Sequence, residues 1–353
     1  MGYNIGMEKY SFSIGDKRIG SNHPVLIQTR NRIKTSRIKE NLKELKPLVP
    51  CGLDRIRFSV LDKADALSLK TYGKELGIPV IADIHYQPEL AYLALENGAD
   101  KIRINPGNWL DNSHLIKLIH LCEEKNIPIR IGVNSGSLNK YKGKGKNPID
   151  DYFLALDETL DIFRQEGFTH LVLSLKSTDI EQTLSLYEEA DRKYPYPLHI
   201  GLTESGYGLI GARKTEAAIL PLLKEGIGDT IRVSLADDRI EEIRACKELL
   251  KLSGRKKDIP DLIVCPGCGR RAHNRRPIAH LVQSRLDKVR KNIKVAIMGC
   301  PVNGIGEAKD SDLGLAGTGN KDTLIFFSKG KIIGTYKVKE AIEKLFEEIV
   351  LNP

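Results

Sequence analysis

The residues best suited to chemistry lie on two short loops near the end of the chain. The first loop carries Cys265 and Cys268, with a proline and a glycine between them, and the second carries Cys300 and, seven residues later, Glu307. Proline and glycine favour a tight turn. Two cysteines separated by such a turn can bind one metal centre. Three thiolates on two loops therefore indicate a metal centre.

These residues alone leave two kinds of centre open. A structural zinc site takes four closed ligands, and His273 or His280 is available as the fourth. Electron-transfer iron–sulfur clusters usually have four cysteine ligands, so a cluster on three cysteines suggests chemistry on a substrate. Glu307 is placed to give such a cluster a weaker oxygen ligand. A zinc knuckle and a reactive cluster both remain possible at this point.

The motifs around the three cysteines resemble the signature of one iron–sulfur family. Residues 265–270 read Cys-Pro-Gly-Cys-Gly-Arg, and residues 299–308 read Gly-Cys-Pro-Val-Asn-Gly-Ile-Gly-Glu-Ala. Both are similar to the 4-hydroxy-3-methylbut-2-en-1-yl diphosphate synthases of the methylerythritol phosphate route to isoprenoids. The resemblance implies a 4Fe–4S cluster whose ligands are Cys265, Cys268, Cys300 and Glu307.

Composition is that of a globular protein. The chain has 353 residues, of which 41% are hydrophobic and 29% charged, about right for a barrel plus an appendage. No window approaches the roughly 20 apolar residues of a bilayer span, and the first residues lack the apolar core of a signal peptide. We expect a cytoplasmic enzyme without a membrane partner. In that reducing compartment Cys51, Cys122 and Cys246 are expected to be packing residues.

The net charge of +9 raises the question of nucleic-acid binding. The densest basic runs, Lys142–Lys146 and Arg255–Lys257, contain no aromatic residues on which bases could stack. Lysine spread along the whole chain is more typical of a soluble surface or of ion-pair networks. We therefore expect no nucleic-acid partner.

The elements that must position these groups follow a regular rhythm. Short apolar runs alternate eight times with amphipathic stretches, which predicts an α/β fold, a (β/α)8 TIM barrel. An open doubly wound sheet would need a glycine-rich dinucleotide fingerprint after the first strand, and none is present. The expected strands are Val25–Gln28, Arg55–Val60, Pro79–Ile84, Lys101–Asn105, Pro128–Asn134, His170–Leu175, Leu198–Leu202 and Thr230–Ser234. The expected helices are Ser36–Val49, Ala64–Leu76, Pro88–Asn97, Asp111–Glu124, Asp150–Glu166, Ile180–Arg192, Gly211–Lys224 and Asp238–Leu252.

The rhythm changes after a polar, proline-tipped run at Ser253–Pro260, which we interpret as a linker. We expect a barrel domain at residues 1–254 and a smaller α+β cluster domain at residues 255–353. The second domain should contain helices at Pro277–Arg290 and Lys339–Val350, a strand before Cys300, and a hairpin turning at Ser328–Lys331.

Barrel enzymes carry their active sites at the carboxyl ends of the strands. Here cations recur at those ends. An inward-pointing arginine is costly to bury without an anion, and an ion pair with Asp83 or Glu204 could explain any single one. Five cations on five strands with few interior acids instead favour a pocket for a phosphate or diphosphate. The cations are Arg57, Arg103, Arg130, Lys176 and Arg232.

Several barrel segments resemble the same family, so the resemblance spans about residues 22 to 320. The matching segments are Ala82–His85, Arg103–Asn108, Arg130–Leu138, Gly201–Gly206 and Glu225–Leu235. The resemblance implies that the diphosphate of the substrate is held by Arg57, Arg103, Arg130, Asn134, Lys176, Arg232 and Ser234. It also implies that Glu204, Asp83 and His85 line the carbon skeleton as catalytic residues, with Glu204 as the proton donor. As single residues, Asp83 and His85 could equally be a hydrogen-bonded pair at the barrel mouth.

Two positions depart from the family pattern. The first strand ends with Arg30 and Arg32 where the family usually carries a Ser-Met-Thr-like run, and no role is assigned to either arginine. Ile305 stands where a proline is common, which leaves the glycine-rich loop and Glu307 intact. No large insertion separates the two domains, so the chain resembles the compact bacterial two-domain form.

The resemblance implies an oxidoreductase that opens 2-C-methyl-D-erythritol 2,4-cyclodiphosphate reductively to 4-hydroxy-3-methylbut-2-enyl diphosphate and water. It implies flavodoxin or ferredoxin as electron donor. It also implies a homodimer in which the cluster domain of one subunit caps the barrel of the other. The rival hypotheses are a zinc-ribbon barrel that binds nucleic acid and a phosphate-binding lyase or transferase with a structural metal.

Overall fold

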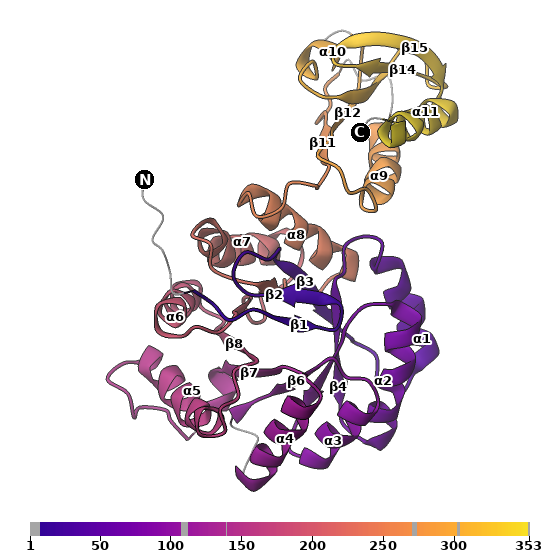
Figure 1. Cartoon of the computed structure of the whole chain (residues 1–353). Coiled ribbons are helices and arrows are strands. Elements are labelled where there is room, and N and C mark those ends of the chain that lie inside the picture. The colour runs from indigo at the N-terminus through magenta and orange to yellow at the C-terminus, as the bar shows by residue number, and fades with distance from the viewer. Residues whose placement is uncertain (1–7, 107–111, 139, 270–273, 302–303, 352–353) are drawn as a thin grey trace. The chain divides into compact units, whose positions relative to one another are not determined.

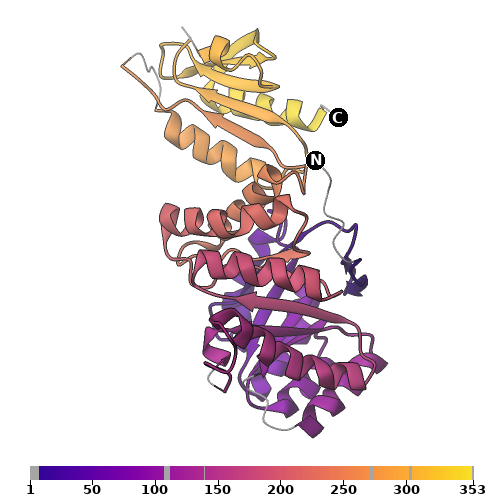
Figure 2. The same cartoon turned by 90° about the vertical axis from the view of Figure 1, so that its left-hand side faces the viewer.

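The computed structural model of the chain describes residues 8–106, 112–138, 140–269, 274–301 and 304–351. The chain divides into two compact units, Met1–Lys256 and Lys257–Pro353 (Figures 1 and 2).

The first unit is a ring of eight parallel strands, which confirms the predicted barrel. Neighbours follow the order β8-β7-β6-β5-β4-β3-β10-β9, and a parallel bridge between Leu173 and Leu198 links β8 to β9. An open doubly wound sheet is thereby excluded. The strands are β3 (Leu26–Arg30), β4 (Arg55–Val60), β5 (Val80–Ile84), β6 (Lys101–Ile104), β7 (Ile129–Asn134), β8 (Leu171–Lys176), β9 (His199–Ile200) and β10 (Thr230–Ile231).

In the described part of the barrel unit, helices α1 to α8 surround the strands (Figure 1). Side chains cap α2, α5 and α6, where the carboxylates of Asp62 and Asp179 and the amide oxygen of Asn147 accept hydrogen bonds from first-turn N–H groups. The Asn147 cap begins its helix two residues earlier than predicted. The helices are α1 (Ile38–Leu45), α2 (Lys63–Leu76), α3 (Pro88–Glu96), α4 (Asn112–Glu124), α5 (Pro148–Gln165), α6 (Ile180–Lys193), α7 (Gly208–Lys224) and α8 (Arg239–Leu252).

The sequence did not predict the hairpin of β1 (Phe12–Ile14) and β2 (Lys17–Ile19). Its two strands have three residues each, too short for a periodic signal. Ile14 and Ile19 are fully buried and pack against Leu26, at the start of β3. The hairpin therefore closes the amino-terminal end of the barrel and leaves the carboxyl-terminal end open.

Strands β9 and β10 are shorter than predicted, with two paired residues each. Beyond them Gly201 lies so close to the carbonyl oxygen of Arg232 that a Cβ atom would come within 2.5 Å of it. The two backbones leave the regular ladder here. Their side chains remain next to the open end of the barrel.

The second unit is a five-stranded mixed sheet with helices on both faces. Helices α9 and α11 pack on one face in the main apolar core, and α10 leads into Ala308 on the other face. The sequence missed β11, β13 and α10, which are short. The elements are β11 (Asp261–Val264), α9 (Arg275–Leu286), β12 (Lys294–Met298), α10 (Gly304–Glu307), β13 (Leu313–Gly317), β14 (Thr323–Ser328), β15 (Lys331–Lys337) and α11 (Val338–Leu351).

Among the residues that the structure describes, no helix combines the length and the apolar character needed to cross a bilayer.

Candidate active site

A polar pocket of about 670 Å³ opens at the carboxyl ends of the barrel strands. All ten barrel residues predicted from the sequence line this one pocket. They are Arg57, Asp83, His85, Arg103, Arg130, Asn134, Lys176, Glu204, Arg232 and Ser234.

Strand register explains how three of these side chains meet. Asp83, Arg103 and Arg130 occupy laterally paired positions on β5, β6 and β7, so the two-residue period of a strand turns all three toward the barrel axis. The arginines need room there. A Cβ atom at Gly132 would lie 2.9 Å from Nε of Arg103, so this glycine makes space for the guanidinium.

Asp83 is an interior acid that partly neutralises two of the cations. Its Oδ1 accepts a hydrogen bond of 2.9 Å from Nη1 of Arg103, and its Oδ2 lies 3.4 Å from Nε of Arg57. Burial opposes the charged carboxylate, but Arg103 and Arg57 outweigh it and hold the pKa of Asp83 well below its usual value. The ion-pair alternative is therefore correct for these two arginines. Nε2 of His85 lies 3.7 Å from Asp83 Oδ2, beyond a direct hydrogen bond.

The other three cations have no carboxylate within ion-pair distance among the described residues. Arg130 and Arg232 are 2% and 8% exposed. Nε and Nη1 of Arg130 and Nε of Arg232 are buried without a hydrogen-bond partner. The pKa of Lys176 lies well below its usual value. Burial is the largest cause, followed by the positive charges of Arg232 and Arg130. This electrostatic cost is relieved when an anion with several charges enters the pocket.

Glu204 reaches the pocket from a strained backbone. Its φ of 52° lies in the left-handed region, which costs a residue other than glycine on the order of 1 kcal/mol. The flanking chain holds this conformation, because Thr203 N donates to Ser177 O and Ala236 N donates to Gly206 O. Such strain marks a position that the surrounding structure enforces.

The pocket also contains residues that the sequence did not assign. Ser59 and Ser174 lie on the same inward faces as Arg57 and Lys176, so strand periodicity could have found them. Glu242 comes from α8 and is 2% exposed. Its only signal is a charged residue on the buried face of a helix. The remaining unassigned cations are Arg30 and Arg32.

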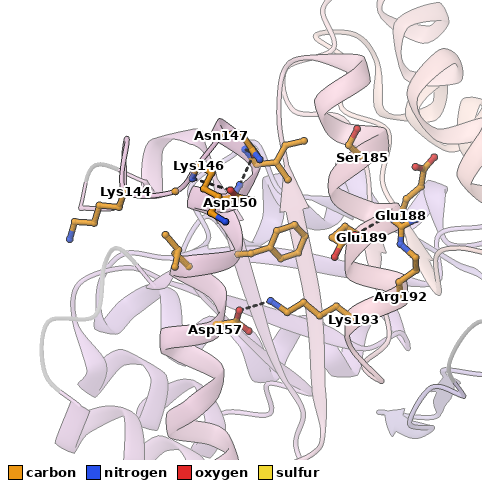
Figure 3. Close-up of a pocket in the computed structure, with 14 residues that line it drawn as sticks. Lys144, Lys146, Asn147, Asp150, Asp157, Ser185, Glu188, Glu189, Arg192 and Lys193 are labelled. Atoms are coloured by element: carbon orange, nitrogen blue, oxygen red, sulfur yellow. Dashed lines mark hydrogen bonds and ion pairs between the residues drawn. The ribbon is translucent and has the colours of Figure 1, made fainter.

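A second hollow of about 750 Å³ lies outside the barrel between α5 and α6 (Figure 3). Its charges largely neutralise one another. Lys193 lies 2.7 Å from Asp157, and Arg192 lies 2.8 Å from Glu189. An anion would have to compete with these pairs, so the barrel pocket is the better candidate for an active site.

In the second unit, Cys265 and Cys300 follow neighbouring parallel strands. Cys265 comes directly after β11, and its N–H donates to Ile297 O of β12 at 3.0 Å, while Cys300 lies two residues past the end of β12. Cys265 and Ile305 both pack against the same apolar cluster around Met298. Ile305 lies two residues before Glu307 in the sequence. The two loops therefore emerge at one edge of the sheet.

Three cysteine thiols and one carboxylate are the donors that these two loops offer a metal centre. Among the described residues, no three His, Cys, Asp or Glu side chains are gathered closely enough to hold a metal ion. His280 is exposed on α9, and His273 falls outside the described residues. Cys268 and Glu307 are exposed, so both can reach a group larger than a single ion.

The other cysteines cannot complete the set. Cys51, Cys122 and Cys246 belong to the barrel unit and are buried. Burial raises the pKa of Cys246 to about 12 and that of Cys122 as well. A thiol in such surroundings resists forming the thiolate that binds metal.

Lys176 gives the pocket a testable pH dependence. A bound polyanion stabilises the ammonium form, so the depressed pKa of Lys176 must rise on binding. At pH values between the free and bound pKa, inorganic diphosphate should bind with uptake of a proton, and its affinity should fall as pH rises. Calorimetry in buffers with different ionisation enthalpies measures this uptake. The same measurement on the Lys176→Met variant gives the proton uptake that comes from diphosphate itself, and this value is subtracted. Equal proton uptake by the variant and the unmodified protein would contradict the prediction.

Family comparisons cover almost the whole chain. The model of the GcpE TIM-barrel domain matches residues 10–247, and that of the GcpE protein C-terminal domain matches residues 261–350. A relative from Clostridium perfringens is 42% identical over 344 residues, covering 97% of this chain and 98% of its own. One from Caldanaerobacter subterraneus is 41% identical over 341 residues, covering 95% of both. Both are named 4-hydroxy-3-methylbut-2-en-1-yl diphosphate synthase (flavodoxin).

Solved structures resemble the barrel in fold alone. A dihydropteroate synthase from Xanthomonas albilineans is 10% identical, with a TM-score of 0.51 over 69% of this chain and 96% of its own. The HPPK-DHPS protein of Plasmodium falciparum is 12% identical, with a TM-score of 0.52 over 70% of this chain and 51% of its own. The sequence matches decide the family, and they agree with the cationic barrel pocket and the paired cysteine loops. The chain belongs to the GcpE family of 4-hydroxy-3-methylbut-2-en-1-yl diphosphate synthases.

Proposed function

We propose that this chain converts 2-C-methyl-D-erythritol 2,4-cyclodiphosphate into 4-hydroxy-3-methylbut-2-enyl diphosphate and water. The cyclic diphosphate opens at a carbon–oxygen bond, a hydroxyl group leaves as water, and a carbon–carbon double bond forms. Two electrons and two protons balance the reaction. The observation that carries the proposal is a barrel pocket lined by five cations at strand ends, only two of which pair with Asp83, in a chain that also carries three cysteines on paired loops.

The cationic side of the pocket would bind the diphosphate. Negative charge grows on this group as the ring opens, and preorganised guanidinium groups stabilise that charge without reorganising. Gly201 leaves room for Lys176, because a Cβ atom there would lie 2.6 Å from its Nζ. The proposed diphosphate ligands are Arg57, Arg103, Arg130, Asn134, Lys176, Arg232 and Ser234.

Glu204 would donate the proton to the departing hydroxyl group. It is an exposed carboxyl group in the pocket, and no ion pair engages it among the described residues. Asp83 is a poor donor, because its low pKa keeps it ionised at neutral pH. We assign Asp83 and His85 to lining the carbon skeleton, with Asp83 orienting Arg57 and Arg103.

Cys265, Cys268, Cys300 and Glu307 would hold a 4Fe–4S cluster. Such a cluster supplies electrons one at a time, which suits a reductive elimination better than a hydride donor. The names of the relatives support flavodoxin as the electron donor, and ferredoxin is the alternative. We place the enzyme in the cytoplasm, where reducing conditions keep the cysteine thiols available.

The active enzyme would be a homodimer in which the cluster domain of one subunit caps the barrel of the other. The rim of the barrel pocket supports this proposal. Large apolar side chains there are about three-quarters exposed, and such patches mark interaction surfaces. Tyr86 follows the pocket residue His85, and Tyr207, Leu209 and Ile210 follow Glu204.

Anaerobic purification with metal and sulfide analysis tests the proposed function. We expect a brown protein with about four irons and four sulfides per chain. With reduced methyl viologen as electron source, it should convert the cyclic diphosphate to the linear one. Stoichiometric zinc in place of iron would contradict the cluster. A correctly loaded protein that leaves the cyclic diphosphate unchanged would contradict the reaction.

A further inference from the structure

The first barrel strand brings Arg30 into the pocket, in addition to the five cations at the ends of other strands. Leu26, Gln28 and Arg30 share the inward face of β3 by the two-residue period of the strand. Leu26 packs in the closed amino-terminal end of the barrel, and Arg30 lies at the opposite, open end. Arg30 therefore adds a cation to the open end of the barrel.

The neighbouring Arg32 is fully engaged by the protein itself. Its Nη2 donates to Leu235 O at 2.8 Å and to Oε1 of Glu242 at 3.2 Å, and its Nη1 donates to Asp237 O. These bonds fasten the end of β3 to the segment between β10 and α8. Arg32 therefore has a structural role in the wall of the pocket.

Arg30 differs from Arg32 because its guanidinium has no hydrogen bond or ion pair within the described part of the chain. The nearby acid Glu242 is already occupied, since it accepts from the hydroxyl of Thr29 at 2.6 Å and from Arg32. The backbone at this position is nevertheless fixed, because the buried Arg239 donates to the carbonyl oxygen of Arg30. The unpaired guanidinium group of Arg30 therefore extends from a backbone position that a hydrogen bond holds in place.

The neighbours of Arg30 in the pocket are themselves cations. Arg30 and Arg57 are laterally paired on β3 and β4. Arg30, Arg57 and Arg232 all line the same pocket. Burial lowers the pKa values of Arg57 and Arg232 most, and the positive charge of Arg30 is among the further causes that lower both. Arg30 is exposed to the solvent of the open pocket, whereas Arg57 and Arg232 are buried deeper in it. An anion bound among these three cations would offset their mutual repulsion.

We propose that Arg30 is a further substrate-binding residue, which grips one phosphoryl group of the diphosphate together with Arg57 and Arg232. This inference rests on the proposed function and assigns a specific contact within the same site. Asp83 pairs with Arg103 and Arg57 from β5, and Glu242 pairs with Arg32, so neither carboxylate pairs with Arg30. The extra arginine gives this chain a tighter hold on a diphosphate than an uncharged residue would.

The test compares Arg30→Met with Arg18→Met. Arg18 is exposed on β2 of the hairpin at the closed end of the barrel, so its loss removes the same charge far from the pocket. A charge-assisted contact is worth about tenfold in affinity. For Arg30→Met we expect the Kd of inorganic diphosphate and the KM of the cyclic substrate to rise by about that factor. Arg18→Met should match the unmodified protein.

Two further readouts keep the outcomes distinct. Arg30→Lys should recover part of the diphosphate affinity, because it restores the charge without the planar fork. Equal diphosphate affinity in Arg30→Met and the unmodified protein would overturn the role of Arg30, even if the enzyme is active. Loss of diphosphate affinity in a protein that never turns over the cyclic substrate would support the Arg30 contact and contradict the proposed reaction.

Discussion

Replacing Cys300 with serine is expected to give a folded protein without a stable iron–sulfur cluster and without activity. Cys300 lies just past the end of β12 and is 7% exposed, so its side chain has a fixed direction at the edge of the sheet. A serine hydroxyl is a far poorer iron ligand than a thiolate. Loss of a residue that only hydrogen-bonds to a metal ligand already lowers metal affinity or activity by about 10- to 100-fold. Loss of a ligand should lower turnover by at least about a hundredfold.

Iron and sulfide content, the visible absorption spectrum and turnover check this prediction. Cys122→Ala is the matched control, because Cys122 is buried in the barrel and takes no part in the proposed centre. The control is expected to lose some stability but to keep its iron. A Cys300→Ser protein with full iron content and normal turnover would show that the cluster is held elsewhere.

Replacing Glu204 with glutamine should abolish turnover while leaving the cluster and the fold intact. Glutamine has nearly the same shape but cannot donate the proton that the departing hydroxyl group needs. Removal of a positioned general acid typically lowers the rate by about 100- to 10,000-fold. The backbone strain at φ 52° is the same for both residues, so the melting temperature should stay close to that of the unmodified protein.

The decisive measurement is kcat, with iron content and diphosphate affinity recorded for the same preparation. Iron content and diphosphate affinity should be unchanged, because Glu204 is neither a proposed cluster ligand nor a proposed diphosphate ligand. Glu204→Asp shortens the side chain but keeps the acid, and we expect it to retain partial activity. Full activity in Glu204→Gln would refute the proton-donor role.

Mixing these two inactive variants tests the proposed homodimer. If the cluster domain of one subunit serves the barrel of the other, a mixed dimer contains one intact pair: the cluster of Glu204→Gln and the barrel of Cys300→Ser. Random exchange of subunits should then restore about a quarter of the full activity. If each cluster serves its own barrel, the mixture should stay inactive. The two arrangements therefore give opposite results.

The sequence by itself determined the chemistry and the class of fold. Alternating apolar runs predicted the barrel, because a buried parallel strand must be apolar and its crossover helix amphipathic. Cations at strand ends predicted an anion pocket, since the carboxyl ends of barrel strands converge on one opening. Cysteine spacing predicted a metal centre. Each of these signals is local, within one element or one loop.

Only the tertiary structure decided which charged groups neutralise one another. Arg30 ends β3 and Arg32 lies two residues beyond it. Arg32 is bound by Glu242 and two carbonyl groups, while Arg30 is laterally paired with Arg57 and has no such partner in the described part of the chain. Glu242 comes from α8, more than 200 residues along the chain. No local pattern can reveal such a pairing, because the Coulomb energy of a charge depends on distances in space that only the closed barrel fixes.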